Sequence, residues 1–483
     1  MKLVLAVVDG MKPAMVRRAV ETGHAPVMAK VMQRGTFVDD CVAAFPSVTP
    51  VCATSIATGA RQDVHRIPAM NWFWREERRY VEYGSSMRAA RRFGIGQQLT
   101  DLIYTMNGEH LAPEARTIYE VLDDAGVRTA GTTYLTTRGR HEHWPSKATA
   151  LSRVAATAFK RPVMGPAEFF YADVFASRET PCRSILGKPG LRDQHAGCVG
   201  SYLLEHDLCD FLLLSLPDND THSHRFGPDS QVASIAAADR QIERLAQTAG
   251  GIDAFLDEHA LVVVADHSHA LIEQRIEFEA AFRDFHVLGP SAAGFDEAEI
   301  ALCPSARSAQ IYILVPEGRG ELLPRLVTES LALDGVEHVL HRDDGEGVLR
   351  GADGAELRFA PGGDVTDRRG GSWSVDGDLA VVRGRVEDGL LVTTDHPDIL
   401  GRCWAALECP NSGDLFLSAA PGYEFPDWGG VDHVGGGSHG SLHHSDSLGA
   451  LLFCGVEAPE RQAWGIQDVA PLCSSAFGID WPG

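Results

Sequence analysis

Aspartate and histidine, the residue types that bind transition-metal ions, flank several short apolar runs of the sequence. The groups are Asp9, the segment PDNDTHSHRFGP at 217–228, Asp266 with His267, and the segment GGGSHGSLHHSD at 435–446. A single aspartate after a strand is often only a turn or helix N-cap residue. Four such groups at one end of a sheet would repel one another unless cations lay between their carboxylates. Mixed Asp and His ligation suits Zn²⁺ or a similar first-row ion, and the residues suffice for two ions.

A candidate nucleophile lies in the segment FPSVTPVCATSIATG at 45–59. Pro50 suits the first turn of a helix, so Thr49 is predicted to be the helix N-cap. The free N–H groups and the dipole at that helix terminus favour a bound anion. A metal ion beside the Thr49 hydroxyl would lower the hydroxyl pKa and make its oxygen a stronger nucleophile. Taken alone, Thr49 would be interpreted as a structural cap, but the neighbouring candidate ligands favour catalysis.

The predicted fold brings these groups together. Short β-branched runs alternate with amphipathic stretches such as 115–125 and 230–248, which indicates an α/β fold with a mostly parallel sheet and helices on both faces. The clearest predicted strands are Leu3–Val8, Phe211–Leu216, Leu261–Ala265, Gln310–Val315 and Leu448–Cys454. Ligands of such sheets bind beyond the carboxyl ends of the strands, which is where we expect the aspartates and histidines to meet.

Two segments interrupt this alternation. Residues 71–110 are rich in aromatic side chains and arginine and are predicted to form a cap over the site. Within this cap, Trp72 and Phe73 could stack on a substrate base or could equally form the cap's own core. Residues 336–411 are rich in Gly and Asp and predict a small antiparallel α+β insertion. The remaining residues, 1–335 and 412–483, are expected to form the core domain.

The composition excludes several classes of partner. With 44% hydrophobic and 23% charged residues, the 483-residue chain has the composition of a globular protein. Its formal net charge of −23 argues against a nucleic acid or an anionic membrane as a partner. No apolar run reaches the ~20 residues of a membrane span. The N-terminal MKLVLAVVDG is interpreted as a strand rather than a signal peptide.

The cysteines predict a reducing environment. The chain has 10 of them, without a CxxC pair or a short-period framework. Several lie in apolar runs, as Cys52, Cys209, Cys454 and Cys473 do, and are expected to be buried free thiols. Together with the lack of a predicted membrane span, this pattern predicts a cytoplasmic protein.

In the order and spacing of its motifs the chain resembles the alkaline phosphatase superfamily, and most closely its nucleotide pyrophosphatase/phosphodiesterase branch. The matching motifs are VVDG (7–10), FPSVTPVCATSIATG (45–59), HRIPAMNW (65–72), RTIYEVLDDAGVRTAG (116–131), DNDTHSHRFGPDS (218–230), VVVADHS (262–268) and GGSHGS (436–441). They extend over nearly the whole chain, and the set is far more specific than any single motif. The resemblance implies an alkaline-phosphatase-like fold and hydrolysis of phosphate esters with two divalent ions, most simply Zn²⁺, with Mn²⁺ as the alternative.

The same resemblance implies roles for individual residues. One ion would be held by Asp220, His224 and His439, and the other by Asp9, Asp266, His267 and the Thr49 oxygen. Members of the family form a phospho-threonine intermediate, which water then hydrolyses. The resemblance therefore implies that Thr49 carries the phosphoryl group between the two steps.

Two positions of the motif set leave a choice. Asn71 resembles the family asparagine that donates a hydrogen bond to the phosphoryl group, although the segment before it is one residue longer than usual. Asp218 and His222 form an i, i+4 pair that competes with Asp220 and His224. The second pair is favoured because the ending HRFGP is the longer match to the family pattern, which leaves the first pair outside the ligand set.

The predicted function is a phosphodiesterase or nucleotide pyrophosphatase that acts on a small-molecule phosphate ester such as a nucleotide. A phosphomonoesterase or phosphonate hydrolase of the same superfamily is the main alternative. A catalytically silent metal-binding module is more remote, because neither Thr49 nor any ligand of the motif set is missing. The GxSxG pattern at 436–440 would suit a serine esterase only with a strand before it and a helix after it, which the sequence does not predict.

Overall fold

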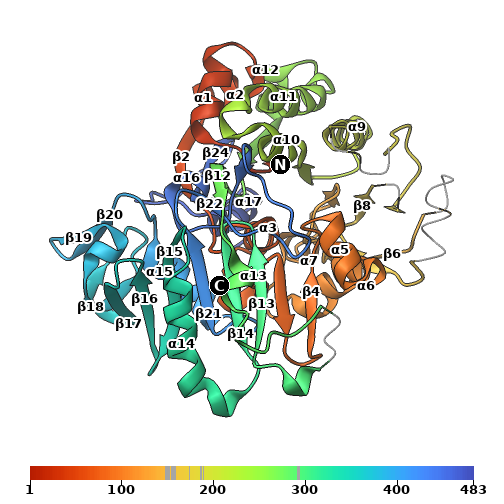
Figure 1. Cartoon of the computed structure of the whole chain (residues 1–483). Helices are drawn as coiled ribbons and strands as arrows, with labels where there is room; N and C mark the ends of the chain where they lie inside the picture. Colours follow the sequence, from red (N-terminus) through yellow and green to blue (C-terminus); the bar gives the residue numbers. More distant parts are fainter. Residues whose placement is uncertain are drawn as a thin grey trace.

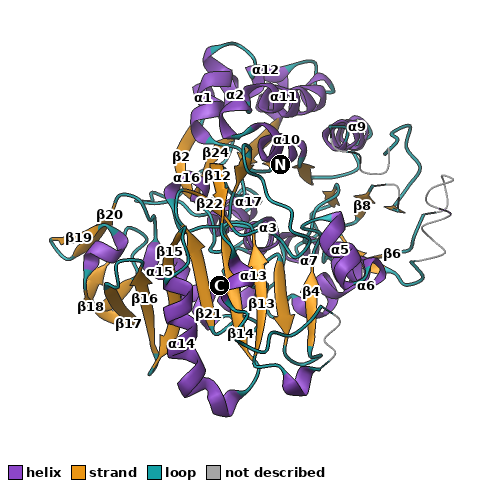
Figure 2. Ribbon diagram, viewed as in Figure 1, coloured by secondary structure: helices purple, strands orange, loops and turns teal. Residues whose placement is uncertain are grey.

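The computed structural model describes residues 1–146, 153, 159–172, 174–184, 188, 190–290 and 294–482. Two large sheets, each with helices packed against it, dominate this part of the chain (Figure 1). Figure 2 shows helices around these sheets, with several of them grouped at the top of the view. No helix among the described residues is both long enough and apolar enough to cross a bilayer.

The first sheet runs through the predicted core. Its strands in spatial order are β2 (Thr36–Val42), β24 (Leu448–Cys454), β11 (His259–Val264), β1 (Lys2–Val8), β10 (Phe211–Leu216), β5 (Thr129–Gly131), β8 (Glu168–Tyr171) and β9 (Phe175–Ala176). The strands from β11 to β8 run parallel to one another. At the edges, β24, β2 and β9 pair antiparallel. The predicted mostly parallel sheet is therefore confirmed.

Helices cover both faces of this sheet. Successive side chains of each strand point to opposite faces, and in the central strands both sets are apolar and need to be buried. The residues of β1 from Leu3 to Val8 belong in turn to two separate buried clusters. On one face lie α3 (Thr49–Thr58), α7 (Ile118–Asp124) and α17 (Val469–Ser475). On the other lie α1 (Pro13–Glu21), α2 (Pro26–Arg34), α9 (Arg192–Glu205), α11 (Val232–Gln247) and α12 (Ile252–Glu258). Helices α1, α2, α11 and α12 gather at the top of Figure 1.

The second sheet is mainly antiparallel and contains the strands of the predicted insertion. Its order is β13 (Ile300–Ser305), β14 (Ser308–Ile313), β21 (Leu415–Ala419), β15 (Val336–Asp343), β16 (Glu346–Gly351), β17 (Glu356–Thr366), β20 (Leu390–Thr393) and β19 (Gly384–Glu387), with β18 (Ser372–Gly377) on β17. Helices α14 (Arg319–Leu331) and α15 (Ile399–Glu408) belong to separate buried clusters on this sheet. Strand β15 pairs with β21, which pairs in turn with β14, so the strands of 336–411 continue a sheet formed by residues on both sides of them in the sequence.

The predicted cap is a hairpin followed by helices. Strands β3 (Asn71–Trp74) and β4 (Arg79–Glu82) pair antiparallel. The helices after them are α5 (Met87–Phe93), α6 (Ile95–Thr100) and the π-helix η1 (Asp101–His110). The other short helices are α4 (Gln62–His65), α10 (Asp218–Phe226), α13 (Phe278–Ala281) and α16 (His444–Ser447). The other short strands are β6 (His141–His143), β7 (Val163–Gly165), β12 (Ala270–Arg275), β22 (Gly422–Glu424) and β23 (Gly437–Ser438). The 3₁₀ turns η2 to η6 are Pro228–Ser230, Phe295–Glu297, Pro316–Gly318, Leu379–Val382 and Ile466–Asp468.

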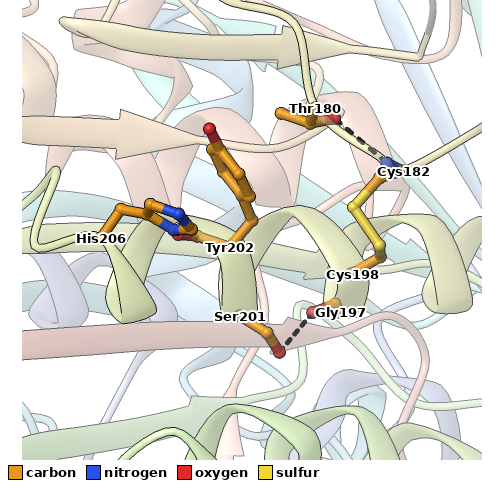
Figure 3. Close-up of a disulfide and its surroundings, with 7 residues drawn as sticks. All are labelled: Thr180, Cys182, Gly197, Cys198, Ser201, Tyr202 and His206. Atoms are coloured by element: carbon orange, nitrogen blue, oxygen red, sulfur yellow. Dashed lines mark hydrogen bonds between the residues drawn. A yellow bond between two sulfur atoms is a disulfide. The ribbon is translucent and has the colours of Figure 1, made fainter.

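A disulfide joins Cys182, in the segment before α9, to Cys198 within that helix (Figure 3). The reducing environment predicted from the cysteines does not fit this bonded pair. The two residues are 16 positions apart, a spacing that has no recognisable pattern in the sequence. The cysteines in the apolar runs are buried free thiols, as predicted. Because disulfides persist mainly in oxidising environments, the cysteine pattern no longer supports a reducing compartment.

Candidate active site

Most of the predicted ligands converge at the carboxyl ends of the central parallel strands. Asp9 follows β1, Asp266 and His267 follow β11, and α10, which follows β10, carries Asp220 and His224. Strand β1 pairs in parallel with both β10 and β11, so the three strand ends lie side by side. The sheet topology therefore brings together residues that are more than 250 positions apart in the sequence.

His439 reaches the same place from the C-terminal part of the chain. It follows β23, which pairs antiparallel with β12 so that Ser438 lies opposite Ala270. This register sets His439 beside the residues that follow β11. The rings of His267 and His439 stack with their centroids 3.6 Å apart and their planes inclined by 13°.

Thr49, Asp9, Asp266 and His267 form a first group, which we call the Thr49 cluster. His267 Nε2 lies 3.3 Å from Thr49 Oγ1 and 3.4 Å from both Asp9 Oδ1 and Asp266 Oδ2. Ligand atoms bound at about 2.1 Å around a tetrahedral ion lie about 3.4 Å apart. The spacing of the four side chains therefore suits a single divalent ion.

Backbone hydrogen bonds fix the direction of these ligands. Asp266 Oδ1 accepts hydrogen bonds from the N–H groups of Gly10 and His267, both at 3.0 Å, while its Oδ2 is buried without a partner. Asp9 Oδ1 is likewise buried without a partner. His267 Nδ1 donates to the Ser268 carbonyl at 3.0 Å, which turns Nε2 towards the cluster. Burial and the neighbouring carboxylates raise the pKa of Asp9 well above its usual value, because both disfavour its ionised form. A bound cation would stabilise that ionised form.

A second group, the Asp220 cluster, is centred on one carboxylate oxygen. Asp220 Oδ1 lies 3.0 Å from His269 Nε2, 3.2 Å from His224 Nε2 and 3.6 Å from His439 Nε2. Three imidazoles thus face a single carboxylate oxygen from different elements. Burial favours the neutral acid, but His224 and His269 outweigh this effect and hold the pKa of Asp220 well below its usual range.

Two of the three imidazoles of the Asp220 cluster are also oriented by hydrogen bonds at Nδ1. His224 Nδ1 donates to the Gly437 carbonyl and His439 Nδ1 to the Ser47 carbonyl, each at 2.8 Å. Such bonds select the tautomer in which Nε2 carries a lone pair towards a metal. Two adjacent groups, Asp9 with Asp266 and His267 and Asp220 with His267, His269 and His439, have ligand atoms close enough together to hold divalent ions.

The competing i, i+4 pair on α10 lies outside both clusters. Asp218 accepts hydrogen bonds from backbone N–H groups at the start of α9 and pairs with Arg192 at 2.8 Å. His222 Nε2 faces a backbone carbonyl at 3.2 Å. Of the two pairs, the structure brings Asp220 and His224 into the Asp220 cluster.

Thr49 is the first residue of helix α3 rather than its N-cap. The helix begins at Thr49 and Val48 is the cap, because the Val48 carbonyl accepts the first intrahelical bonds, from Val51 at 3.1 Å and from Cys52 at 3.0 Å. The predicted N-cap position is therefore wrong by one residue. Thr49 still lies at the positive end of the helix and lines the same pocket as Asp220, His224 and His439.

The cap residues predicted to contact substrate are buried instead. Trp72 and Phe73 are 0% and 1% exposed within the main hydrophobic cluster, and the Trp72 ring packs edge-on against His110. Asn71 is 0% exposed, and its amide donates to the Pro304 carbonyl at 2.6 Å. Neither ring face of the two aromatic residues is open to a ligand, so the stacking prediction is not supported.

A pocket of about 280 Å³ opens over the clusters. Its lining includes Thr49, Met70, Arg192, Glu424 and His433. Met70, the residue before Asn71, lines this pocket, whereas the Asn71 amide is turned to the Pro304 carbonyl. The guanidinium of Arg192 adds one positive side chain beside the clusters, and its other contacts are to Asp218 and to neighbouring oxygens of α10.

His269 is a candidate ligand that the sequence prediction did not include. It follows Asp266 and His267 in the run DHSH, and the second histidine of that run was the available signal. A residue two positions further on points to the same side only if the chain stays extended. Here β12 begins directly afterwards at Ala270 and holds His269 between the two clusters.

The sequence and the structure of this chain were compared with those of known proteins, and the similarities found are consistent with the α/β fold described above. A sequence model of the family described as Type I phosphodiesterase / nucleotide pyrophosphatase matches residues 3–319. A search of curated protein sequences found no match. Among solved structures, murine ectonucleotide pyrophosphatase / phosphodiesterase 5 in complex with AMP is similar, with a TM-score of 0.60, 12% identity, and coverage of 100% of this chain and 96% of that chain.

Two further solved structures are similar over nearly their whole length. Human ectonucleotide pyrophosphatase / phosphodiesterase 5 has a TM-score of 0.58 and 14% identity, with 100% of this chain and 96% of that chain covered. Phosphonoacetate hydrolase from Sinorhizobium meliloti 1021, in complex with phosphonoacetate, has a TM-score of 0.58 and 17% identity, with 99% and 95% covered. At these identities the likeness shows the fold.

Proposed function

Because the chain belongs to the type I phosphodiesterase / nucleotide pyrophosphatase family of phosphoester hydrolases, we propose that it hydrolyses phosphodiester or pyrophosphate bonds with Thr49 as the nucleophile. The observation that carries this proposal is the Thr49 cluster, in which the hydroxyl oxygen lies 3.3 Å from His267 Nε2 beside two buried carboxylates. A threonine that served only to start helix α3 would not need two carboxylate oxygens without hydrogen-bond partners next to it.

Two divalent ions, Zn²⁺ or Mn²⁺, are proposed as cofactors. Asp9, Asp266, His267 and the Thr49 oxygen would hold one, and Asp220, His224 and His439 the other. When bound, such ions lower the pKa of a neighbouring hydroxyl and neutralise charge on a phosphoryl group. The unpartnered Asp9 Oδ1 and Asp266 Oδ2 atoms support this assignment.

The Thr49 oxygen would attack phosphorus while the bond from phosphorus to the leaving oxygen breaks. The leaving group departs with the electron pair of that bond, and the Thr49 hydroxyl proton is lost to the surroundings. Water then attacks the phospho-threonine, the bond from phosphorus to the Thr49 oxygen breaks, and that oxygen regains a proton. Thr49 is at the N-terminus of α3, whose free N–H groups would favour the negative charge of the phosphoryl oxygens.

A small phosphate ester such as a nucleotide is the proposed substrate. The AMP complex of a structural neighbour supports a nucleotide-sized ligand for this fold. Arg192 supports a second candidate function, because a positive side chain in the pocket suits the extra charge of a phosphomonoester or a phosphonate. The phosphonoacetate complex of another neighbour points the same way.

Parallel assays separate the two candidates. Bis-p-nitrophenyl phosphate, p-nitrophenyl phosphate and an aryl phosphonate are offered to the metal-stripped protein and to protein supplied with Zn²⁺ or Mn²⁺. The proposal predicts metal-dependent turnover that is fastest with the diester. Turnover of the monoester or the phosphonate alone would favour the second function, and Arg192→Gln should then raise KM for that substrate selectively.

A further inference from the structure

Three buried ligand atoms face one another in the second sheet, away from the two active-site clusters. Within the described part of the chain, Glu337 Oε2, His338 Nδ1 and His396 Nε2 have no hydrogen-bond partner. His338 is 1% exposed and His396 is 0% exposed, so water does not replace the missing partners freely. Three such atoms without a hydrogen bond in one place are costly unless something else binds them. We call these residues the Glu337 cluster.

The separations within this cluster resemble those around a metal ion. His396 Nε2 lies 3.5 Å from Glu337 Oε1, and His338 Nδ1 lies 4.0 Å from Glu337 Oε2. One ligand atom from each residue can be chosen so that all lie within 4.8 Å of one another. Ligands of a tetrahedral zinc ion are about 3.4 Å apart, so small side-chain rotations would complete the site.

Each imidazole is anchored through its other nitrogen. His338 Nε2 donates to the Val381 carbonyl at 2.8 Å, and His396 Nδ1 donates to the Val382 carbonyl at 3.3 Å. Both carbonyls belong to the short turn η5. These bonds leave the lone pairs of His338 Nδ1 and His396 Nε2 on the side of Glu337. Metal-binding histidines are commonly oriented in the same way, by a hydrogen bond from the ring nitrogen that does not bind the metal.

An irregularity in β15 explains how neighbouring residues share the site. Side chains of consecutive strand residues normally point to opposite faces. The pairing of β15 with β21 shifts register between Val336 and His338, which makes Glu337 the extra residue of a bulge. A bulge turns a side chain away from its regular direction, and here it sets Glu337 beside His338.

Charged neighbours surround the cluster without completing it. Arg383 lies 3.4 Å from Glu337 Oε1 but is 56% exposed, so it can move towards solvent. The His443 ring lies 5.9 Å from the His396 ring, and it belongs with Asp395 and the 45%-exposed His444 to an adjoining group of potential ligands. This adjoining group gives the buried cluster a polar edge that is open to solvent.

From this geometry we infer that Glu337, His338 and His396 form a binding site for a divalent transition-metal ion such as Zn²⁺, separate from the active site. Two imidazoles and one carboxylate are a zinc ligand set, and the fourth position would be taken by water. The inference does not depend on the proposed function, because it uses none of the active-site residues.

The role of this ion would be structural. It would join β15 to the loop before α15, which are distant in the sequence. That loop also accepts a backbone hydrogen bond at Asp395 O from His444 N, at 2.7 Å. Because His444 lies five residues after His439, the ion would steady the second sheet against the segment that carries an active-site ligand.

Anomalous diffraction at the zinc edge, on crystals of the full chain grown with Zn²⁺, tests the inference directly. We expect a peak at about 2.0–2.2 Å from Glu337, His338 Nδ1 and His396 Nε2. No peak at this position in crystals whose active site holds zinc would overturn it. A peak here with an empty active site would support it while counting against the proposed catalytic function.

Metal content provides a second measurement. After removal of loosely bound metal, His396→Gln and His338→Gln should each retain about one ion per chain fewer than the wild type. His341→Gln is the matched control, because His341 is a buried histidine of the same strand outside the cluster, and it should retain the wild-type content. Equal metal content in all four proteins would overturn the inference. If the glutamine variants do not fold, the diffraction experiment on the wild type decides.

Discussion

His269 Nε2 lies 3.0 Å from Asp220 Oδ1, closer to that oxygen than either of the other two histidines of the Asp220 cluster. Two glycines make room for its ring. A Cβ atom on Gly10 would come within 2.5 Å of His269 Nε2, and one on Gly437 within 3.1 Å of Nδ1. His269 Nδ1 has no hydrogen-bond partner, so the ring contacts polar atoms only through Nε2. The position is that of a metal ligand or of a group that orients Asp220.

His269→Gln is therefore expected to weaken metal binding by about 10- to 100-fold, the usual cost of losing a ligand or its close support. The affinity for Zn²⁺ is measured by competition with a chromophoric chelator. His222→Gln is the control, since His222 is a histidine of the neighbouring helix α10 that faces away from both clusters. Equal affinities for His269→Gln and the wild type would show that the ring only fills space.

The burial of Trp72 predicts a loss of stability rather than a loss of substrate affinity. Trp72→Phe removes volume from a fully buried position and should lower the free energy of unfolding by about 1–3 kcal/mol. KM for bis-p-nitrophenyl phosphate should stay unchanged. A raised KM with unaltered stability would instead support stacking of substrate on this ring.

His65 predicts a loss of stability in acid. Burial lowers its pKa to about 3, and its Nδ1 already accepts a hydrogen bond from the Ile67 N–H at 3.1 Å, which leaves no room for a second proton. The unfolded chain, in which a histidine has a pKa near 6.5, binds more protons between these two values. The stabilising contribution is thus present above pH 6.5 and is lost as the pH falls, by about 2 kcal/mol at pH 5.

Urea unfolding at pH 7.5 and pH 5 measures this effect. The wild type should lose more free energy of unfolding between the two pH values than His65→Gln, which has no proton to bind. If both proteins lost the same amount, His65 would not be buried in its neutral form.

The Cys182–Cys198 disulfide should stabilise the protein. For a separation of 16 residues, chain-entropy considerations give about 3 kcal/mol. Cys182→Ser should lower the unfolding free energy by this amount and make it insensitive to reductant, whereas the wild type should be destabilised by reductant. A wild type that gave identical unfolding curves with and without reductant would lack the bond.

The convergence of the candidate ligands could be predicted because each follows or precedes an apolar strand in a recognisable motif. The parallel pairing of β1 with β10 and β11 then brings Asp9, Asp220 and Asp266 to one edge. The local sequence determines each strand and the ligand that follows it. The topology of an α/β sheet then places these ligands at the same edge, beyond the carboxyl ends of the strands. The helix start at Thr49 was wrong by only one residue, since Val48 can supply the first carbonyl without a capping side chain.

Other features depend on contacts that no local pattern encodes. Trp72 sits in an exposed-looking Arg-rich segment, yet tertiary packing against His110 buries it. The Glu337 cluster depends on a bulge between β15 and β21 and on a loop nearly 60 residues away. The disulfide likewise joins cysteines whose spacing is uninformative. Side-chain proximity of this kind is set by the folded chain as a whole.

Trapping of the phosphorylated protein tests the central claim most directly. Wild type loaded with Zn²⁺ is mixed with bis-p-nitrophenyl phosphate, quenched in acid within a single turnover and digested for mass spectrometry, with Thr49→Ala treated in parallel. Nucleophilic attack by Thr49 predicts one phosphoryl group on the peptide containing Thr49, its absence in Thr49→Ala, and a loss of turnover of at least about 1,000-fold in that variant. Unchanged turnover in Thr49→Ala, or phosphorylation of a different residue, would contradict it.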